Sequence, residues 1–234
     1  MIETWFAIGL FGMALGTLPP LKRWVQTRED TRIYATLAGI TGIAAVAYTL
    51  MFLGVGVLTV DGRTVFAVRY VDWLLTTPLM VLYLALLAGA SRRTVAALLA
   101  ADVVVIGAGT AATLVAGPER FALFALGAAG YVALLGLLLV VIPRSATFAA
   151  ERDRRSFLKL RNLTVVLWSL YPVVWLLGPA GFGLMLPETM SLVVVYLDLI
   201  SKGVFVFVAV RERGIQFTEG TDETHGTDVT VAAD

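Results

Sequence analysis

A lysine lies in the middle of an apolar run that spans residues 190–210, and Asp198 precedes Lys202 by four residues. A bare ammonium near the centre of a bilayer is costly, so an intramembrane lysine indicates a functional site. An amine in a dry site also favours its neutral form, which condenses with an aldehyde to give a Schiff base. The four-residue spacing places both side chains on one face of a helix. The alternative is a salt bridge, in which Lys202 pairs with Asp198 or with a neighbouring helix.

Five ionisable residues lie away from the ends of the apolar segments: Arg69, Asp72, Asp102, Asp198 and Lys202. Arg69 and Lys202 supply two positive charges, and Asp72 and Asp198 supply two negative ones. These four form a neutral set, as a low-dielectric site demands, and we expect a helix bundle to bring them together. Asp102 is left without a cation, so we expect it to stay protonated and to donate a hydrogen bond.

Large aromatic residues accompany these charges. Trp168, Tyr171 and Trp175 fall at i, i+3 and i+7, on one face of a helix, and Trp73 follows Asp72 directly. Such a stripe more often packs in a core or anchors a helix at the membrane interface. Trp73 and Trp168, however, fall well inside their segments. Several aromatic rings around a lysine and an aspartate suggest a slot for a long, flat, apolar ligand.

The composition is that of an integral membrane protein. Of the 234 residues, 59% are hydrophobic and only 15% are charged, whereas soluble domains are about 45–50% apolar and about 25% charged. The chain has no cysteine, and its one histidine, His225, lies in a polar C-terminal stretch. Disulfides, thiolate chemistry and an intramembrane histidine site are therefore excluded. We expect neither a metal site nor a nucleic-acid partner.

Seven segments are long and apolar enough to cross the hydrocarbon, which takes about 20 residues of helix. They cover residues 3–24, 32–59, 65–88, 93–116, 118–142, 157–177 and 188–211. The sequence therefore predicts an all-α membrane protein, a seven-transmembrane-helix bundle, with one domain over residues 1–213. Residues 214–234 are polar and acidic, and we expect a disordered cytoplasmic tail. Pro172 interrupts the sixth segment and predicts either a static kink or a hinge.

Lysine and arginine are distributed unevenly between the two ends of these segments. One side of the membrane holds only Arg63 and Arg120. The other side holds Lys22, Arg23, Arg28, Arg32, Arg92, Arg93, Arg144, Arg152, Arg154, Arg155, Lys159, Arg161, Arg211 and Arg213. Because cytoplasmic loops carry the excess of positive residues, we expect an extracellular N-terminus and a cytoplasmic C-terminus in the cell membrane. Small residues on several segments permit close helix packing, which leaves a monomer and a homo-oligomer both open.

Three motifs follow one another along the chain: RYVDWLLTTPL at 69–79, RNLTVVLWSLYPVVWLLGP at 161–179 and YLDLISK at 196–202. Together they closely resemble the haloarchaeal microbial (type 1) rhodopsins, over essentially the whole chain. The resemblance implies an internal pocket for all-trans retinal, bound as a protonated Schiff base on Lys202. It implies Asp72 as counterion and proton acceptor, Asp198 as second carboxylate and Arg69 as outer-side cation. The other retinal-binding residues that it implies are Trp73, Thr76, Thr77, Val105, Gly109, Phe124, Gly127, Trp168, Tyr171, Trp175 and Ser201.

The proton-handling groups of a pump are missing from their expected positions. Pumps of this family place an aspartate eleven residues after the counterion, about 16 Å further along the helix, where this chain has Tyr83. Tyrosine is a poor proton donor at neutral pH. Outward pumps also carry two glutamates between the sixth and seventh helices, and the matching positions are Ala180 and Met190. Glu188 lies nearby but is better explained as a helix-capping residue, and a chloride pump would have threonine in place of Asp72.

Other positions resemble sensory rhodopsin II (phoborhodopsin), a photoreceptor for repellent phototaxis. They are Val105, Phe124 and Gly127 around the ring end of retinal, and Ser201 immediately before the attachment lysine. Tyr196 would lie on the face that docks a two-helix methyl-accepting transducer. Leu186 departs from the pattern, because a known receptor of this class has a hydroxyl there that bonds the transducer.

We therefore expect a light-sensing photoreceptor, without enzymatic turnover, that signals through a membrane transducer in blue-green light. One alternative is a light-driven outward proton pump with a slow photocycle, since both share the retinal site. Another is a seven-helix transporter that uses aspartate–lysine pairing and binds no retinal.

Overall fold

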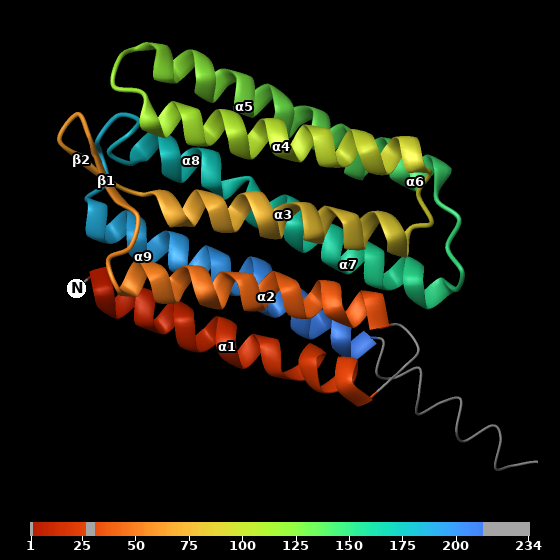
Figure 1. Ribbon diagram of the computed structural model, residues 1–234. Coiled ribbons are helices and arrows are strands. Elements are labelled where there is room, and N and C mark those ends of the chain that lie inside the picture. The colour runs from red at the N-terminus through yellow and green to blue at the C-terminus, as the bar shows by residue number, and fades with distance from the viewer. Residues whose placement is uncertain (1, 27–30, 213–234) are drawn as a thin grey trace, which may run out of the picture.

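The computed structural model describes residues 2–26 and 31–212, and seven of its helices are apolar and long enough to cross a membrane (Figure 1). They cover Ile2–Gln26, Thr31–Phe52, Ala67–Leu87, Arg92–Leu114, Glu119–Ser145, Glu151–Leu177 and Pro187–Glu212. The predicted seven-helix membrane bundle is confirmed. The expected tail from residue 214 onward, with its boundary at residue 213, lies outside the described residues.

The bundle closes by packing its last helix against its first. The first five spans contain α1 (Ile2–Gln26), α2 (Thr31–Phe52), α3 (Ala67–Leu87), α4 (Arg92–Leu114) and α5 (Glu119–Gly136). The last two contain α7 (Glu151–Trp168), α8 (Leu170–Leu177), α9 (Pro187–Asp198) and a π-helical stretch, η2 (Leu199–Val204). Each of α1 to α5 packs against the next, α3 also contacts α7, and α9 contacts α1. In Figure 1, α3 consequently lies inside the bundle, between the α4–α5 layer and α2.

A short β-hairpin joins the second and third spans, where the sequence predicted continuous helix as far as residue 59. Strands β1 (Val57–Val60) and β2 (Arg63–Phe66) pair antiparallel, with Val60 opposite Arg63. Gly54 and Gly56 take positive φ angles of 74° and 70°, which an α-helix does not allow, so α2 ends at Phe52. Asp61 and Gly62 then form the turn, also with positive φ, a dipeptide typical of two-residue hairpins. The predicted ends of both spans were therefore wrong here.

The fifth and sixth spans also differ in length from the prediction. The fifth does not end at residue 142. It passes without a break through a π-helical stretch, η1 (Leu137–Val141), and α6 (Ile142–Ser145), and Pro143 lies within this continuous span. The sixth begins at Glu151 rather than at residue 157. Its first turns are charged, so a helix that continues beyond the membrane into water has no apolar signal there.

The interior of the bundle is apolar except for a small set of charged and hydroxyl side chains. All five ionisable residues singled out from the sequence are buried: Arg69, Asp72, Asp102, Asp198 and Lys202. They come from α3, α4 and the α9–η2 segment. A buried charge has to find a partner or lose its charge, so these helices define the candidate site.

Candidate functional site

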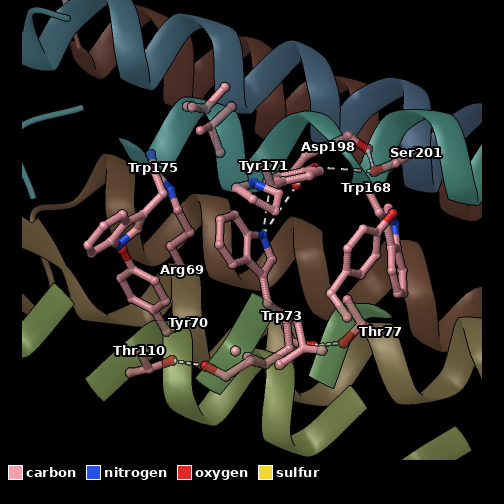
Figure 2. A pocket seen from close by; sticks show the side chains of 18 of the residues that line it. Arg69, Tyr70, Trp73, Thr77, Thr110, Trp168, Tyr171, Trp175, Asp198 and Ser201 are labelled. Carbon is pink, nitrogen blue, oxygen red and sulfur yellow. Dashed lines mark hydrogen bonds between the residues drawn. The ribbon is translucent and has the colours of Figure 1, made fainter. Parts of the chain in front are cut away.

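A cavity of about 120 Å³ lies inside the bundle, walled by α3, α4, α5, α7, α8, α9 and η2 (Figure 2). Among the residues predicted to bind retinal, those lining it are Trp73, Thr77, Val105, Gly109, Phe124, Gly127, Trp168, Tyr171, Trp175, Ser201 and Lys202. Thr76 is buried beside them, and its hydroxyl donates to the carbonyl of Asp72 at 2.8 Å. Figure 2 shows Arg69, Tyr70 and Trp175 toward one end of this cavity, and Trp168, Ser201 and Thr77 toward the other.

Lys202 forms an ion pair with Asp72 on the neighbouring helix α3. The lysine Nζ lies 2.5 Å from Oδ2 of Asp72, and the two side chains are 2% and 0% exposed. The structure thus pairs Lys202 across helices, and the alternative partner Asp198 was wrong. The four-residue spacing does place Asp198 and Lys202 on one face of the helix, but the Asp198 carboxylate accepts hydrogen bonds from other donors instead.

Three aromatic donors converge on Asp198. Tyr48 from α2 donates to Oδ2 at 2.7 Å, and Tyr171 from α8 donates to Oδ1 at 2.6 Å. The indole Nε1 of Trp73 lies 3.2 Å from Oδ1, and its ring meets Tyr171 edge-on at 5.1 Å. Figure 2 shows Trp73 and Tyr171 turned toward this carboxylate. Because these donors come from three different helices, the network fixes Asp198 in the cavity wall.

Arg69 is held by aromatic rings rather than by an acid. Its guanidinium carbon lies 5.8 Å from the ring centre of Phe6 and 5.6 Å from that of Phe66. Within residues 2–26 and 31–212, its Nε and Nη2 have no hydrogen-bond partner. The expected set of four charges is therefore brought to one region without a closed ring of ion pairs. Lys202 and Asp72 form a direct ion pair, Asp198 accepts from tyrosine and tryptophan donors, and the Arg69 guanidinium packs on the faces of two aromatic rings.

Asp102 faces Thr77 across the α3–α4 contact. The two oxygens, Thr77 Oγ1 and Asp102 Oδ2, lie 2.9 Å apart, and the same hydroxyl lies 2.8 Å from the carbonyl of Trp73. A hydroxyl has only one proton to donate. If that proton goes to the carbonyl, the bond to Asp102 requires a proton on the carboxyl. If the proton goes instead to Asp102, the carboxyl needs no proton of its own, so the protonation of Asp102 stays a prediction.

Several hydroxyl residues in or beside the cavity wall were missed by sequence reasoning, and Tyr70, Thr110 and Tyr131 line it. Thr113 on α4 accepts hydrogen bonds from Trp175 Nε1 at 2.9 Å and from the Tyr70 hydroxyl at 3.1 Å, so it links three helices. Tyr131 on α5 lines the cavity and bonds to the sixth span. Tyr48 was also overlooked. A tyrosine in the middle of an apolar span has to satisfy its hydroxyl, and that rule could have drawn attention to Tyr48 and Tyr131.

The positions that separate a pump from a sensor are now placed. Tyr83 is buried, and its ring meets Phe205 edge-on at 5.8 Å. Ala180 is buried, Met190 lines the cavity, and Glu188 is exposed in the first turn of α9. Of these four positions only Glu188 carries a carboxyl group, and it is exposed rather than in the cavity wall.

The cavity suits a long, flat, apolar ligand that carries an aldehyde. Lys202 supplies the amine at this wall, which otherwise consists mainly of aromatic and aliphatic side chains, with several hydroxyl groups, Arg69 and Asp198. Phe124 and Trp175 stack with their ring centres 4.6 Å apart and their planes at 18°, which forms a flat wall at the α5–α8 side. Gly109 and Gly127 keep that region open. The donor set and the shape thus fit retinal. Within residues 2–26 and 31–212, no group of three or more histidine, cysteine, aspartate or glutamate side chains is placed to hold a metal ion.

Comparisons with known proteins point the same way. Residues 1–216 match the family model described as bacteriorhodopsin-like protein. The chain is 55% identical to sensory rhodopsin-2 of Halobacterium salinarum over 89% of this chain and 88% of the relative. It is 42% identical to sensory rhodopsin-2 of Natronomonas pharaonis, over 99% of this chain and 98% of the relative. The solved structure of thermophilic rhodopsin from Rubrobacter xylanophilus superposes with a TM-score of 0.86 at 37% identity, over 92% of this chain and 96% of that one. The chain belongs to the bacteriorhodopsin-like protein family.

Proposed function

We propose that this chain is a light-sensing photoreceptor for repellent phototaxis in blue-green light. It carries all-trans retinal on Lys202 as a protonated Schiff base and signals through a two-helix transducer in the membrane, without enzymatic turnover. The observation that carries the retinal site is the buried pair of Lys202 and Asp72, whose lysine lines the cavity. The relatives named sensory rhodopsin-2 support sensing over pumping.

Retinal supplies the absorption of light and the change of shape that follows it. The chain's own residues then move one proton. Asp72 Oδ2 lies 2.5 Å from Lys202 Nζ and is placed to accept the proton of that nitrogen. Oδ1 of Asp72 has no hydrogen-bond partner in the described part of the chain, whereas Asp198 already accepts from three donors. Asp72 is therefore the freer acceptor, and Asp198 and Arg69 form its fixed electrostatic surroundings.

The return of the proton distinguishes a sensor from a pump. A pump needs an acid on the inner side that reprotonates the lysine nitrogen quickly, and this chain has the buried Tyr83 there. Because a free tyrosine titrates near about pH 10, it holds its proton at neutral pH. The deprotonated state should therefore be long-lived, which gives a transducer time to respond. A small permeant acid such as azide should shorten it.

The signal leaves through the seventh span. Ser201 lies 3.4 Å from the Tyr171 hydroxyl, next to the attachment lysine. On the lipid-facing side of the same span Tyr196 is 49% exposed, and we assign this face to the transducer. Leu186 is exposed just before α9 and has no hydroxyl, so the contact with the transducer at this position differs from that of the known receptor or is absent. The excess of positive residues supports an extracellular N-terminus and a cytoplasmic C-terminus.

Light-driven proton flux across vesicles tests the sensor against the pump, because both share the pair of Lys202 and Asp72. The retinal-bound chain is reconstituted alone, and the pH outside the vesicles is followed under steady light with and without azide. We expect weak transport without azide and stronger transport with it. Vigorous transport that does not respond to azide would establish the pump. The absence of a visible band after retinal addition would favour the transporter that binds no retinal.

A further inference from the structure

The sixth span is interrupted beside the cavity. Helix α7 ends at Trp168, α8 begins at Leu170, and Ser169 lies between them. Pro172 has no N–H, so the carbonyl of Trp168 loses its usual helical partner four residues ahead. The N–H of Ser169 still donates to the carbonyl of Val165, at 3.2 Å. This break is a point where the two parts of the span can bend relative to each other.

A tyrosine from another helix is bonded to this break. The Tyr131 hydroxyl, on α5, donates to the carbonyl of Val165 at 3.0 Å and lies 3.0 Å from Oγ of Ser169. Ser169 Oγ itself donates to the Val165 carbonyl at 2.7 Å. The three oxygens form one cluster, in which Tyr131 provides the link between helices. In a membrane such polar groups have to be satisfied within the protein, which strengthens the preference for this arrangement.

The same tyrosine also forms part of the cavity wall. Tyr131 is buried, lines the cavity, and belongs to the same packed cluster as Trp168, which lines the cavity as well. Trp168 directly precedes Ser169. A displacement of the Trp168 ring by a ligand that changes shape therefore acts on a segment whose next residue is bonded to Tyr131.

We propose that the Tyr131 hydroxyl is a latch that holds the α7–α8 break in its resting geometry and so sets the lifetime of the light-activated state. This rests on the proposed function of the site. Tyr131 acts through the helix and not on the reacting nitrogen, so it is a positioning residue. The latch bond is present at rest and absent once the break has bent. Its removal therefore slows the return, because the helix no longer regains that bond on closing.

Two variants and two measurements test the latch. Tyr131→Phe and Ser169→Ala, singly and together, are examined by flash photolysis with retinal. The retinal-free chains are examined by hydrogen exchange of the peptide that contains residues 165–172. In Tyr131→Phe, the loss of one neutral hydrogen bond should lengthen the lifetime of the light-activated state by roughly two- to tenfold. It should speed hydrogen exchange of the 165–172 peptide by the same factor. The double variant should change by less than the product of the two single effects, because both substitutions remove hydrogen bonds from the same three-oxygen cluster.

A matched control is Ser145→Ala. Ser145 is exposed in the fifth span and makes the same bond to the carbonyl four residues earlier, 2.9 Å to Val141, far along the chain from the break. In Ser145→Ala the lifetime of the light-activated state and the hydrogen exchange of the 165–172 peptide should equal those of the unmodified chain.

Unchanged exchange in Tyr131→Phe, or single effects that multiply fully in the double variant, would overturn the latch. If Tyr131→Phe does not fold, a longer lifetime in Ser169→Ala supports the latch and an unchanged one refutes it. If the unmodified chain shows no visible band, the proposed function fails, while hydrogen exchange still decides the latch.

Discussion

The ion pair of Lys202 and Asp72 makes a quantitative prediction for the retinal-free chain. The nitrogen and oxygen lie 2.5 Å apart, and the side chains are 2% and 0% exposed. In Asp72→Asn the ammonium stays buried without its counter-charge, and removing one partner of a buried pair costs about 3–5 kcal/mol. At about 2–4 °C per kcal/mol for a chain of this size, Tm should fall by roughly 6–20 °C.

A double-mutant cycle separates the pair from other effects of the substitution. Lys202→Met leaves the carboxylate of Asp72 without its partner and should destabilise the chain in the same way. The double variant, Asp72→Asn with Lys202→Met, should recover most of the loss, since neutral side chains of similar size replace a buried pair nearly without penalty. A matched control is Lys159→Met, which removes an exposed pair with Glu212 of similar length, 2.7 Å. That loss should be below about 1 kcal/mol.

The assay is thermal and denaturant unfolding of the four variants in detergent, followed by circular dichroism. Two results would refute the reasoning. One is a loss in Asp72→Asn no larger than that of the surface control. The other is a double variant whose loss equals the sum of the two single losses, because independent sites add and a shared ion pair does not.

Three further predictions follow from the site and the fold. Tyr83→Asp installs a carboxyl donor and should shorten the deprotonated state at least about tenfold, with azide then having little effect in flash photolysis. Tyr48→Phe removes one hydrogen-bond donor from Asp198 and should lower the free energy of unfolding by about 1–3 kcal/mol. Tyr34→Phe, at another buried tyrosine, is the comparison. Gly62→Ala places a side chain at φ 71° in the hairpin turn and should cost about 1 kcal/mol; an unchanged Tm would mean that the hairpin contributes little to stability.

The seven spans and the identity of the charged residues could be predicted because they follow from hydropathy along the chain. Bilayer thickness sets the length of each span, and a buried charge is conspicuous in an apolar run. The ends of the spans were less predictable. The hairpin at Val57–Val60 and Arg63–Phe66 is itself apolar and β-branched, so hydropathy merges it with the neighbouring helices. The positive φ angles of Gly54 and Gly56 decide where α2 ends.

Which side chains contact each other was much harder to predict. Spacing places Asp198 and Lys202 on one helical face, but the rotation of each helix about its axis decides that Lys202 meets Asp72 instead. The partners of Tyr48 and Tyr131 lie 150 and 38 residues away along the chain. A tyrosine in an apolar span indicates that its hydroxyl has a partner, but only the packing of the helices identifies that partner.

The most direct test of the central claim is the decay of the deprotonated state after a light flash, measured with and without azide on the retinal-bound chain. The claim is that Asp72 takes the proton of the Lys202 nitrogen and that the inner side, with Tyr83, has no fast donor. We predict a visible band that bleaches on the flash and recovers slowly, with recovery accelerated by azide. A fast recovery that azide does not change, or no visible band at all, would contradict the account.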